Sequence, residues 1–170
     1  MRTPAIFAAM LAAALGSAPA AGTAAPAGRA ADLAAAAKVL DAFHAAASRA
    51  DEAAYFELLA PNAVFFGTDS TERWDKEAFR AFAHPYFSQG KGWTFVPSDR
   101  HLDASRGGDV VWFDEKLASE SYGDCRGTGV LERQQDGAWR ITQYHLTIPI
   151  PNDLAKEFVA RIRETAKPKP

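Results

Sequence analysis

The sequence predicts an α+β domain in which helices cover one face of a long antiparallel sheet. In the first half of the chain, apolar residues recur at three- and four-residue spacing, which is typical of amphipathic helices. After Gly92 the apolar period changes to two, and short segments rich in turn-forming residues separate the β-rich runs. Helices followed by strands in direct succession favour an antiparallel meander with the helices packed against it.

The length and charge of the chain limit what it can be. Its 170 residues, 48% of them hydrophobic, suffice for one domain with a substantial core and are too few for two. The formal net charge of -2 does not favour nucleic-acid binding, which usually requires a basic face. We therefore expect no nucleic-acid partner.

The N-terminus has the order of a secretory signal peptide. Arg2 precedes an apolar stretch, Ala5 to Leu15, and residues 18–20 (Ala-Pro-Ala) offer a small-residue site for cleavage after Ala20. The apolar stretch is shorter than the ~20 residues that a membrane-spanning helix needs. We expect residues 1–20 to be removed, the mature protein to be periplasmic or secreted, and the chain to have no membrane span.

The remaining boundaries follow from composition and periodicity. An Ala- and Gly-rich segment follows the signal peptide, a helix with Leu154, Phe158 and Ile162 on one face lies near the C-terminus, and the chain ends in Lys-Pro-Lys-Pro. The expected division is a flexible linker (21–31), a folded domain (32–153), a C-terminal helix (154–166) and a tail (167–170).

Two helices and a strand are expected first. An apolar stripe predicts a helix from about residue 32 to 47, and Asp51 is a suitable N-cap for a short second helix that Pro61 would stop. The following run, residues 63–67 (AVFFG), reads as a short buried strand.

A third helix has the clearest start. Asp75 can cap it, which puts Trp74 just before the cap and Phe79 four residues into the helix. This pairing is a hydrophobic staple, which fixes the angle at which the chain enters a helix. Pro85 is expected to kink or end the helix, because proline removes a backbone donor.

Four β-rich runs follow in the second half. Their separators are short and turn-rich, and Asp136-Gly137 is a strong hairpin signal. The runs expected to form the meander are residues 93–104, 110–120, 125–134 and 138–150.

Several of these segments together resemble a known family. The segments FFGTDSTERWDKEAFRAFAHPYF, VVWFDE, YGDCRGTGVL and DGAWRITQYHLTIPIPND, within roughly residues 35–153, are similar to the SnoaL-like domain of the nuclear transport factor 2-like superfamily. The resemblance implies a cone-like α+β fold, a strongly curved antiparallel sheet around about three helices, and a homodimer through the sheet. The superfamily includes ketosteroid isomerase, polyketide cyclases, dehydratases and a non-catalytic kinase association domain, so function must be argued from the site.

The first candidate site pairs Asp114 and Glu115 on one strand with Arg126 on the next. Adjacent strand residues point to opposite faces, so only one carboxylate can line a pocket: Asp114 together with Trp112, or Glu115 together with Phe113. The sequence leaves this parity open. Arg126 either holds the pocket wall by pairing with a carboxylate or offers its guanidinium to an anionic ligand.

The second candidate site contains His101, His145 and Tyr144. Histidine is the usual group for proton transfer near neutral pH, although a histidine on an apolar sheet face is more often part of the core. Simple alternation places His145 on the face of Trp139 and Ile141, and Tyr144 on the other.

The other histidines, His44 and His84, lie on predicted helices without an evident partner. No pair of histidines has the spacing of a metal-binding motif. We expect neither a metal nor a cofactor.

The single cysteine, Cys125, is interpreted as a packing residue. Catalysis by a thiol needs a thiolate with a base in reach, and the neighbouring Arg126 projects to the opposite face of a strand. Gly127 and Gly129 share the face of Cys125, which indicates close approach of another element or pocket volume.

Three functions are considered. The preferred hypothesis is an exported protein that binds a small, polar-aromatic or anionic molecule in an aromatic-lined pocket. The alternatives are a proton-transferring isomerase, dehydratase or cyclase that uses Asp114, Glu115 or His145, and a non-catalytic dimerisation module. The expected ligand-binding residues are Arg126, Trp112, Asp114, Tyr144, His145, His101, Tyr55 and Tyr86.

Overall fold

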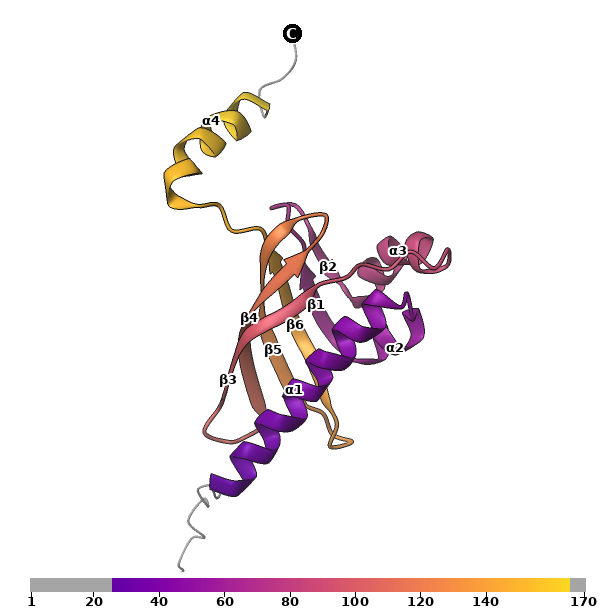
Figure 1. Ribbon diagram of the computed structural model, residues 1–170. Coiled ribbons are helices and arrows are strands. Elements are labelled where there is room, and N and C mark those ends of the chain that lie inside the picture. The colour runs from indigo at the N-terminus through magenta and orange to yellow at the C-terminus, as the bar shows by residue number, and fades with distance from the viewer. Residues whose placement is uncertain (1–25, 166–170) are drawn as a thin grey trace, which may run out of the picture.

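The computed structural model describes residues 26–165 (Figure 1). The predicted signal peptide (1–20), the first part of the predicted linker (21–25) and the predicted tail (167–170) lie outside the described residues. Within the described range, no helix is long and apolar enough to cross a membrane.

The chain folds as the predicted α+β domain. Its first helix begins at Pro26, so residues 26–31, expected in the linker, are helical instead; alanine favours helix and proline is tolerated in the first turn. In chain order, the described elements are α1 (Pro26–Ser48), α2 (Glu52–Glu57), β1 (Leu59–Phe66), β2 (Arg73–Asp75), α3 (Lys76–Phe87), β3 (Val96–Ala104), β4 (Val110–Ser119), β5 (Gly123–Arg133), β6 (Trp139–Thr147), a short 3-10 helix (Asn152–Leu154) and α4 (Ala155–Thr165).

The strands form one curved, unclosed sheet in the order β2-β1-β6-β5-β4-β3. Strands β3 to β6 make the predicted antiparallel meander. The expectation of a wholly antiparallel sheet is corrected at one pair, because β1 runs parallel to β6. Strand β2, a short antiparallel edge partner of β1, was not predicted.

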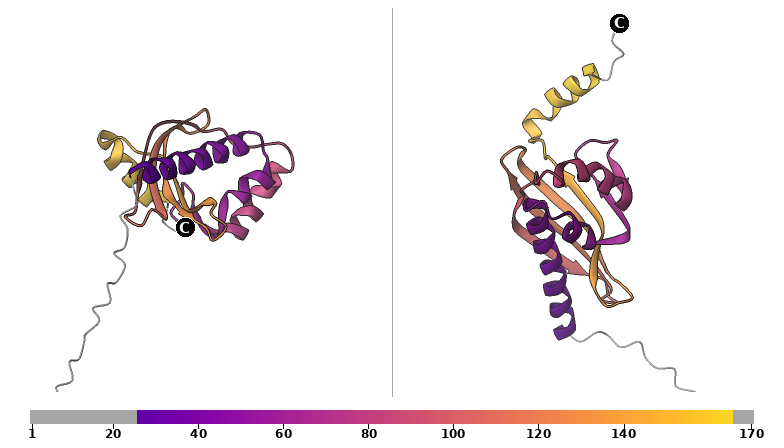
Figure 2. Two further views of the ribbon diagram at one scale, coloured as in Figure 1. Left: turned by 90° about the horizontal axis from the view of Figure 1, so that it is seen from below. Right: turned by 90° about the vertical axis from the view of Figure 1, so that its right-hand side faces the viewer.

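Helices α1, α2 and α3 gather on one side of the sheet, whereas α4 stands away from the rest of the domain (Figures 1 and 2). No residue of α4 is buried, and the face with Leu154, Phe158 and Ile162 is exposed. The core therefore lies between the first three helices and the concave face of the sheet.

Two of the predicted helix starts, those of α2 and α3, are confirmed. Asp51 accepts a hydrogen bond from the backbone N–H of Ala54, and Asp75 accepts one from that of Ala78. The rings of Trp74 and Phe79 stack with centroids 5.7 Å apart, as the hydrophobic staple requires.

The helix ends differ from expectation. Helix α2 already ends at Glu57, and β1 then runs through Pro61. Helix α3 does not end at Pro85 but continues to Phe87. The proline removes a single donor near the end of the helix, and it lies on the exposed side, where water can satisfy the freed carbonyl.

Candidate functional site

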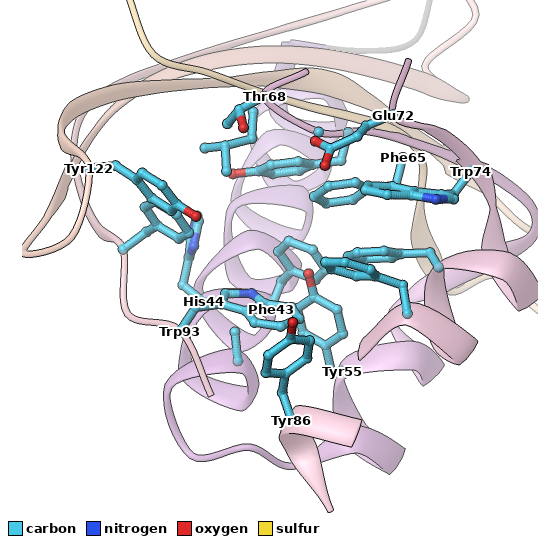
Figure 3. Close-up of a pocket in the computed structure, with 17 residues that line it drawn as sticks. Phe43, His44, Tyr55, Phe65, Thr68, Glu72, Trp74, Tyr86, Trp93 and Tyr122 are labelled. Atoms are coloured by element: carbon cyan, nitrogen blue, oxygen red, sulfur yellow. The ribbon is translucent and has the colours of Figure 1, made fainter. Parts of the chain in front are cut away.

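A cavity of about 260 Å³ lies between the helices and the concave face of the sheet. Its wall is mainly aromatic, and the rings come from both sides of the space (Figure 3). The lining residues are Phe43, His44, Ala47, Tyr55, Phe65, Gly67, Thr68, Glu72, Trp74, Phe79, Phe82, Tyr86, Trp93, Phe95, Tyr122, Tyr144 and Leu146.

The aromatic wall is tightly stacked at its centre. Phe65 of β1 stacks on Phe79 of α3 with centroids 3.9 Å apart, and on Tyr144 of β6 at 5.4 Å. Phe43 of α1 stacks on Tyr55 of α2 at 4.2 Å. These contacts hold flat ring faces and edges toward the cavity, which is the usual setting for a small-molecule site.

Two polar groups of the wall have an unusual position. Tyr55 is fully buried, and its hydroxyl donates to no acceptor among the described residues. Burial raises the pKa of Tyr55 well above its usual value, an effect that a hydrogen bond from the indole of Trp93 partly opposes. The second group is the imidazole of His44, which is nearly buried and contacts the network described next.

Behind His44, the carboxylate of Glu115 is the centre of a buried hydrogen-bond network. Its Oε1 lies 2.7 Å from Nε2 of His44, and its Oε2 accepts a 2.6 Å bond from Nε of Arg100. Burial raises the pKa of Tyr144, and so does its hydrogen-bonded neighbour Glu115, whose negative charge disfavours a phenolate. One carboxylate thus fixes three side chains from α1, β3 and β6.

Helix α1 supplies the other side of this network. Nη1 of Arg100 donates to the carboxylate of Asp41 at 2.6 Å and to the carbonyl of Ala37 at 3.2 Å. Ala37, Asp41 and His44 are spaced four and three residues apart, which puts them on one face of the helix. Burial lowers the pKa of Arg100, but exposed Asp41 and buried Glu115 flank the guanidinium, and together they raise this pKa above its usual value.

The glycines of β5 make room for this network, as the sequence indicated. A Cβ at Gly127 would lie 2.6 Å from the hydroxyl oxygen of Tyr144 and 3.1 Å from Oε1 of Glu115. A Cβ at Gly129 would lie 2.1 Å from the backbone oxygen of Gln143. The residues that approach the two glycines closely belong to the neighbouring strands β4 and β6.

The packing interpretation of Cys125 agrees with its environment. The side chain belongs to the core, 3% exposed, and its pKa is raised by burial and by the nearby Asp124. Arg126 projects to the other face, as alternation along the strand requires.

The structure shows which residues of β4 face the core and which face outward. Glu115 is buried together with Phe113 and Val111, whereas Asp114 and Trp112 are exposed on the outer face. Arg126 is also on the outer face and lies opposite Lys116 in the ladder. The predicted partnership of Arg126 with a pocket carboxylate is therefore wrong.

The regular alternation of inward and outward side chains is interrupted within β6. Val130 pairs with Gln143 and Leu131 with Ile141, so Thr142 is an extra residue and the strand is bulged. Beyond the bulge, Tyr144 and Leu146 turn inward on the side of Trp139 and Ile141. The expectation for His145 is therefore corrected: it faces the outside, near Phe66.

Three of the eight expected ligand-binding residues line the cavity: Tyr55, Tyr86 and Tyr144. The other five are not part of its wall: Arg126, Trp112, Asp114, His145 and His101. The exposed His101 contacts Asp114 at 3.3 Å and Asp99 at 3.6 Å on the outer face.

The sequence reasoning missed His44 and Arg100. His44 was judged to have no partner, yet it bonds to Glu115, and the exposed His84 contacts Glu52 at 2.8 Å. The spacing of Asp41 and His44 on one helix face was a usable signal; their partners, on two strands, were not visible locally. Among residues 26–165, no group of three or more His, Cys, Asp or Glu side chains is placed to hold a metal ion.

The helices inside an open curved sheet, with a cavity between them, have the fold of nuclear transport factor 2-like proteins. The SnoaL-like domain family matches residues 36–151, and the chain belongs to this family. A comparison with curated proteins gives no match.

Solved structures share the fold at low identity. A nuclear transport factor 2-like protein of unknown function from Pseudomonas putida is 19% identical, with a TM-score of 0.59 over 71% of this chain and 91% of that one. A candidate ketosteroid isomerase from Shewanella frigidimarina is 24% identical, with a TM-score of 0.52 over 66% and 94%. A candidate scytalone dehydratase from Novosphingobium aromaticivorans is 8% identical, with a TM-score of 0.61 over 73% and 88%.

Proposed function

We propose that this protein binds a small, uncharged molecule built on one or two aromatic rings in the cavity between its helices and its sheet. The observation that carries the proposal is the aromatic wall around a space of about 260 Å³. This volume lies just below the ~300–1,000 Å³ of typical ligand pockets, so the ligand is small.

The charges around the cavity favour a neutral ligand. The wall contains the carboxylate of Glu72 and the imidazole of His44, but no arginine or lysine of the described chain. The expected anionic ligand depended on Arg126, which lies on the outer face. An anion in the cavity would be desolvated beside a carboxylate without a cation to offset the cost.

Binding can be tested with a matched pair of probes, neutral 2-naphthol and anionic 2-naphthoate, by isothermal titration calorimetry. We expect the neutral compound to bind more tightly. Tyr86→Ala, at the half-exposed rim of the cavity, should weaken binding, and Trp112→Ala, which removes an exposed aromatic ring from the outer face, should not. Equal effects of the two variants, or no binding of 2-naphthol, would contradict the proposal.

A second candidate function is a proton-transferring enzyme of the isomerase, dehydratase or cyclase type. It is favoured by His44, a wall residue held by a buried carboxylate. Of the candidates from the sequence, Asp114 and His145 face outward, and Glu115 reaches the cavity through His44. The names of two structural neighbours, an isomerase and a dehydratase, agree with this candidate.

The enzyme candidate predicts exchange of the C–H protons next to the carbonyl of a bound ketone that contains an aromatic ring. The probe 2-tetralone can be incubated in D₂O with the protein and followed by NMR. Exchange should be faster with wild type than with His44→Gln by about 10² or more, the usual contribution of a general base. Equal exchange rates in the two proteins would remove the enzyme candidate and leave the binding function.

We also propose export and self-association. Residues 1–20 have the order of a signal peptide, and mass spectrometry of the protein from the culture medium or periplasm should show Ala21 at the N-terminus. Trp112 is a large exposed aromatic on the outer sheet face, which suits a homodimer through that face. A monomer by size exclusion with light scattering would contradict the dimer and, with it, the dimerisation module.

A further inference from the structure

We infer that the ligand carries a hydroxyl on its ring system, and that this hydroxyl donates a hydrogen bond to Nδ1 of His44. The inference rests on the proposed binding function and adds the chemical class of ligand: a phenol or an enol rather than a bare hydrocarbon, an ether or a ketone without a donor. Two observations support it: the tautomer of the His44 imidazole, and the buried hydroxyl of Tyr55, which lines the same cavity and donates to no protein acceptor.

The state of the His44 ring is set by Glu115 and Arg100. A guanidinium has only donors, so the Oε2 atom of Glu115, which is 2.6 Å from Nε of Arg100, is an acceptor of a carboxylate. The other carboxylate oxygen lies 2.7 Å from Nε2 of His44, which therefore carries the hydrogen and donates. Arg100 already supplies the positive charge that pairs with Glu115, so a second buried cation beside this carboxylate would lack a compensating charge. The imidazole is therefore neutral, and its remaining nitrogen, Nδ1, is an acceptor.

This acceptor belongs to the cavity. Within residues 26–165 no protein group bonds to Nδ1, and His44 is part of the cavity wall (Figure 3). The ring cannot easily turn away, because Glu115 is itself held by Arg100, which Asp41 holds in turn. A fixed acceptor in a mainly aromatic wall selects ligands that bring a donor.

A second polar group supports the same ligand class. The hydroxyl of Tyr55 is buried, donates to no protein acceptor and lies in the same wall, on α2 next to α1. It can donate to an oxygen of the ligand, since a ligand hydroxyl has acceptor capacity as well as one donor. A hydroxyl-bearing ring therefore satisfies both groups, whereas an ether or a ketone leaves Nδ1 of His44 unpaired.

The test compares ligands of one ring size that differ only in the donor. Calorimetric dissociation constants are measured for 2-naphthol, 2-methoxynaphthalene and naphthalene. For wild type we expect 2-naphthol to bind at least about tenfold more tightly than either other compound, because a buried acceptor rejects ligands that cannot pair with it.

Variants assign the preference to His44. His44→Phe keeps a ring but removes the acceptor, and it should bring the three affinities to within about twofold. Glu115→Gln keeps the shape of the side chain and removes the fixed carboxylate acceptor, so that both tautomers of His44 become accessible and the preference should fall. The control is His84→Gln, at an exposed position of α3 outside the cavity wall, which should keep the wild-type preference.

The outcomes separate the inference from the proposed function. Equal, measurable binding of all three compounds to wild type would overturn the inference and leave the proposed function intact. A hydroxyl preference that survives in Glu115→Gln and in His44→Phe would also overturn it. Failure of all three compounds to bind would overturn both. If neither variant folds, the wild-type affinities decide: tighter binding of 2-naphthol supports the inference, and equal binding of the three compounds overturns it.

Discussion

Replacing Glu115 by alanine should destabilise the fold far more than replacing its neighbour Asp114 by alanine. The two carboxylates are adjacent in sequence, but Glu115 is the buried partner of Arg100, His44 and Tyr144. Asp114 is on the outer face with a 3.3 Å contact to exposed His101.

The magnitude follows from what each side chain leaves behind. The Glu115 side chain is 0% exposed, and its loss strands a guanidinium whose remaining carboxylate, Asp41, is mostly solvent-exposed. Removing one partner of a buried ion pair costs about 3–5 kcal/mol. For a domain of this size, each kcal/mol corresponds to a melting-temperature change of about 2–4 °C, so Glu115→Ala should melt ~6–20 °C lower. The Asp114 side chain is 59% exposed, and its truncation should cost no more than about 0.5 kcal/mol.

The assay is urea unfolding followed by circular dichroism, with thermal melts of the same three proteins. The free energy of unfolding of Glu115→Ala should fall well below that of wild type, whereas the curve of Asp114→Ala should overlay the wild-type curve. Equal losses in both variants would show that Glu115 is not the buried centre of the network. A large loss in Asp114→Ala alone would mean that the strand has the opposite parity.

The remaining predictions concern the glycines, the buried tyrosines, the cysteine and the last helix. Gly127→Ala should lose about 1–3 kcal/mol by urea unfolding, because its Cβ meets Tyr144 and Glu115, whereas Gly28→Ala, with open space around it, should lose nothing. Burial raises the pKa of Tyr55 and Tyr144, so the unfolded chain releases these protons first as the pH rises past about 10; their stabilising effect is complete below that pH and is lost above it. Alkaline unfolding, followed by the absorbance of ionised tyrosine at 295 nm, should show this loss of stability. The variant Tyr144→Phe should reduce both the absorbance step and the steepness with which stability falls with pH. An unchanged pH profile in this variant would contradict the prediction. The thiol of Cys125 should react with Ellman's reagent only when the protein unfolds, and rapid reaction of the native protein would refute the packing interpretation. A chain ending at Pro151 should unfold at the same urea concentration as the full chain, since α4 buries no residue; an earlier midpoint would show that α4 packs on the domain.

Local signals in the sequence predicted most of the fold. The caps Asp51 and Asp75 and the staple between Trp74 and Phe79 act within one helical turn, so they could be read directly and are confirmed. The change of period after Gly92 likewise predicted the antiparallel meander. Parallel pairing of β1 with β6 could not be predicted, because those strands are far apart in the chain.

The candidate site was predicted only in part. Tyr55, Tyr86 and Tyr144 were expected at the ligand and line the cavity, although Tyr144 reaches it only because of the bulge at Thr142. The same bulge sends His145 outward. A single extra residue reverses every side chain beyond it, and nothing in the local composition marks where it falls.

By itself, the sequence determined the class of fold, the starts of α2 and α3, the close approach of other residues to Gly127 and Gly129, and the aromatic character of the core. Only the tertiary structure decided which of Asp114 and Glu115 is inside, and that His44 and Arg100 meet Glu115 there. The physical reason is that caps and periodicity depend on neighbours within a few residues. The contact between His44 and Glu115 joins residues 71 positions apart, and it depends on the register of the whole sheet.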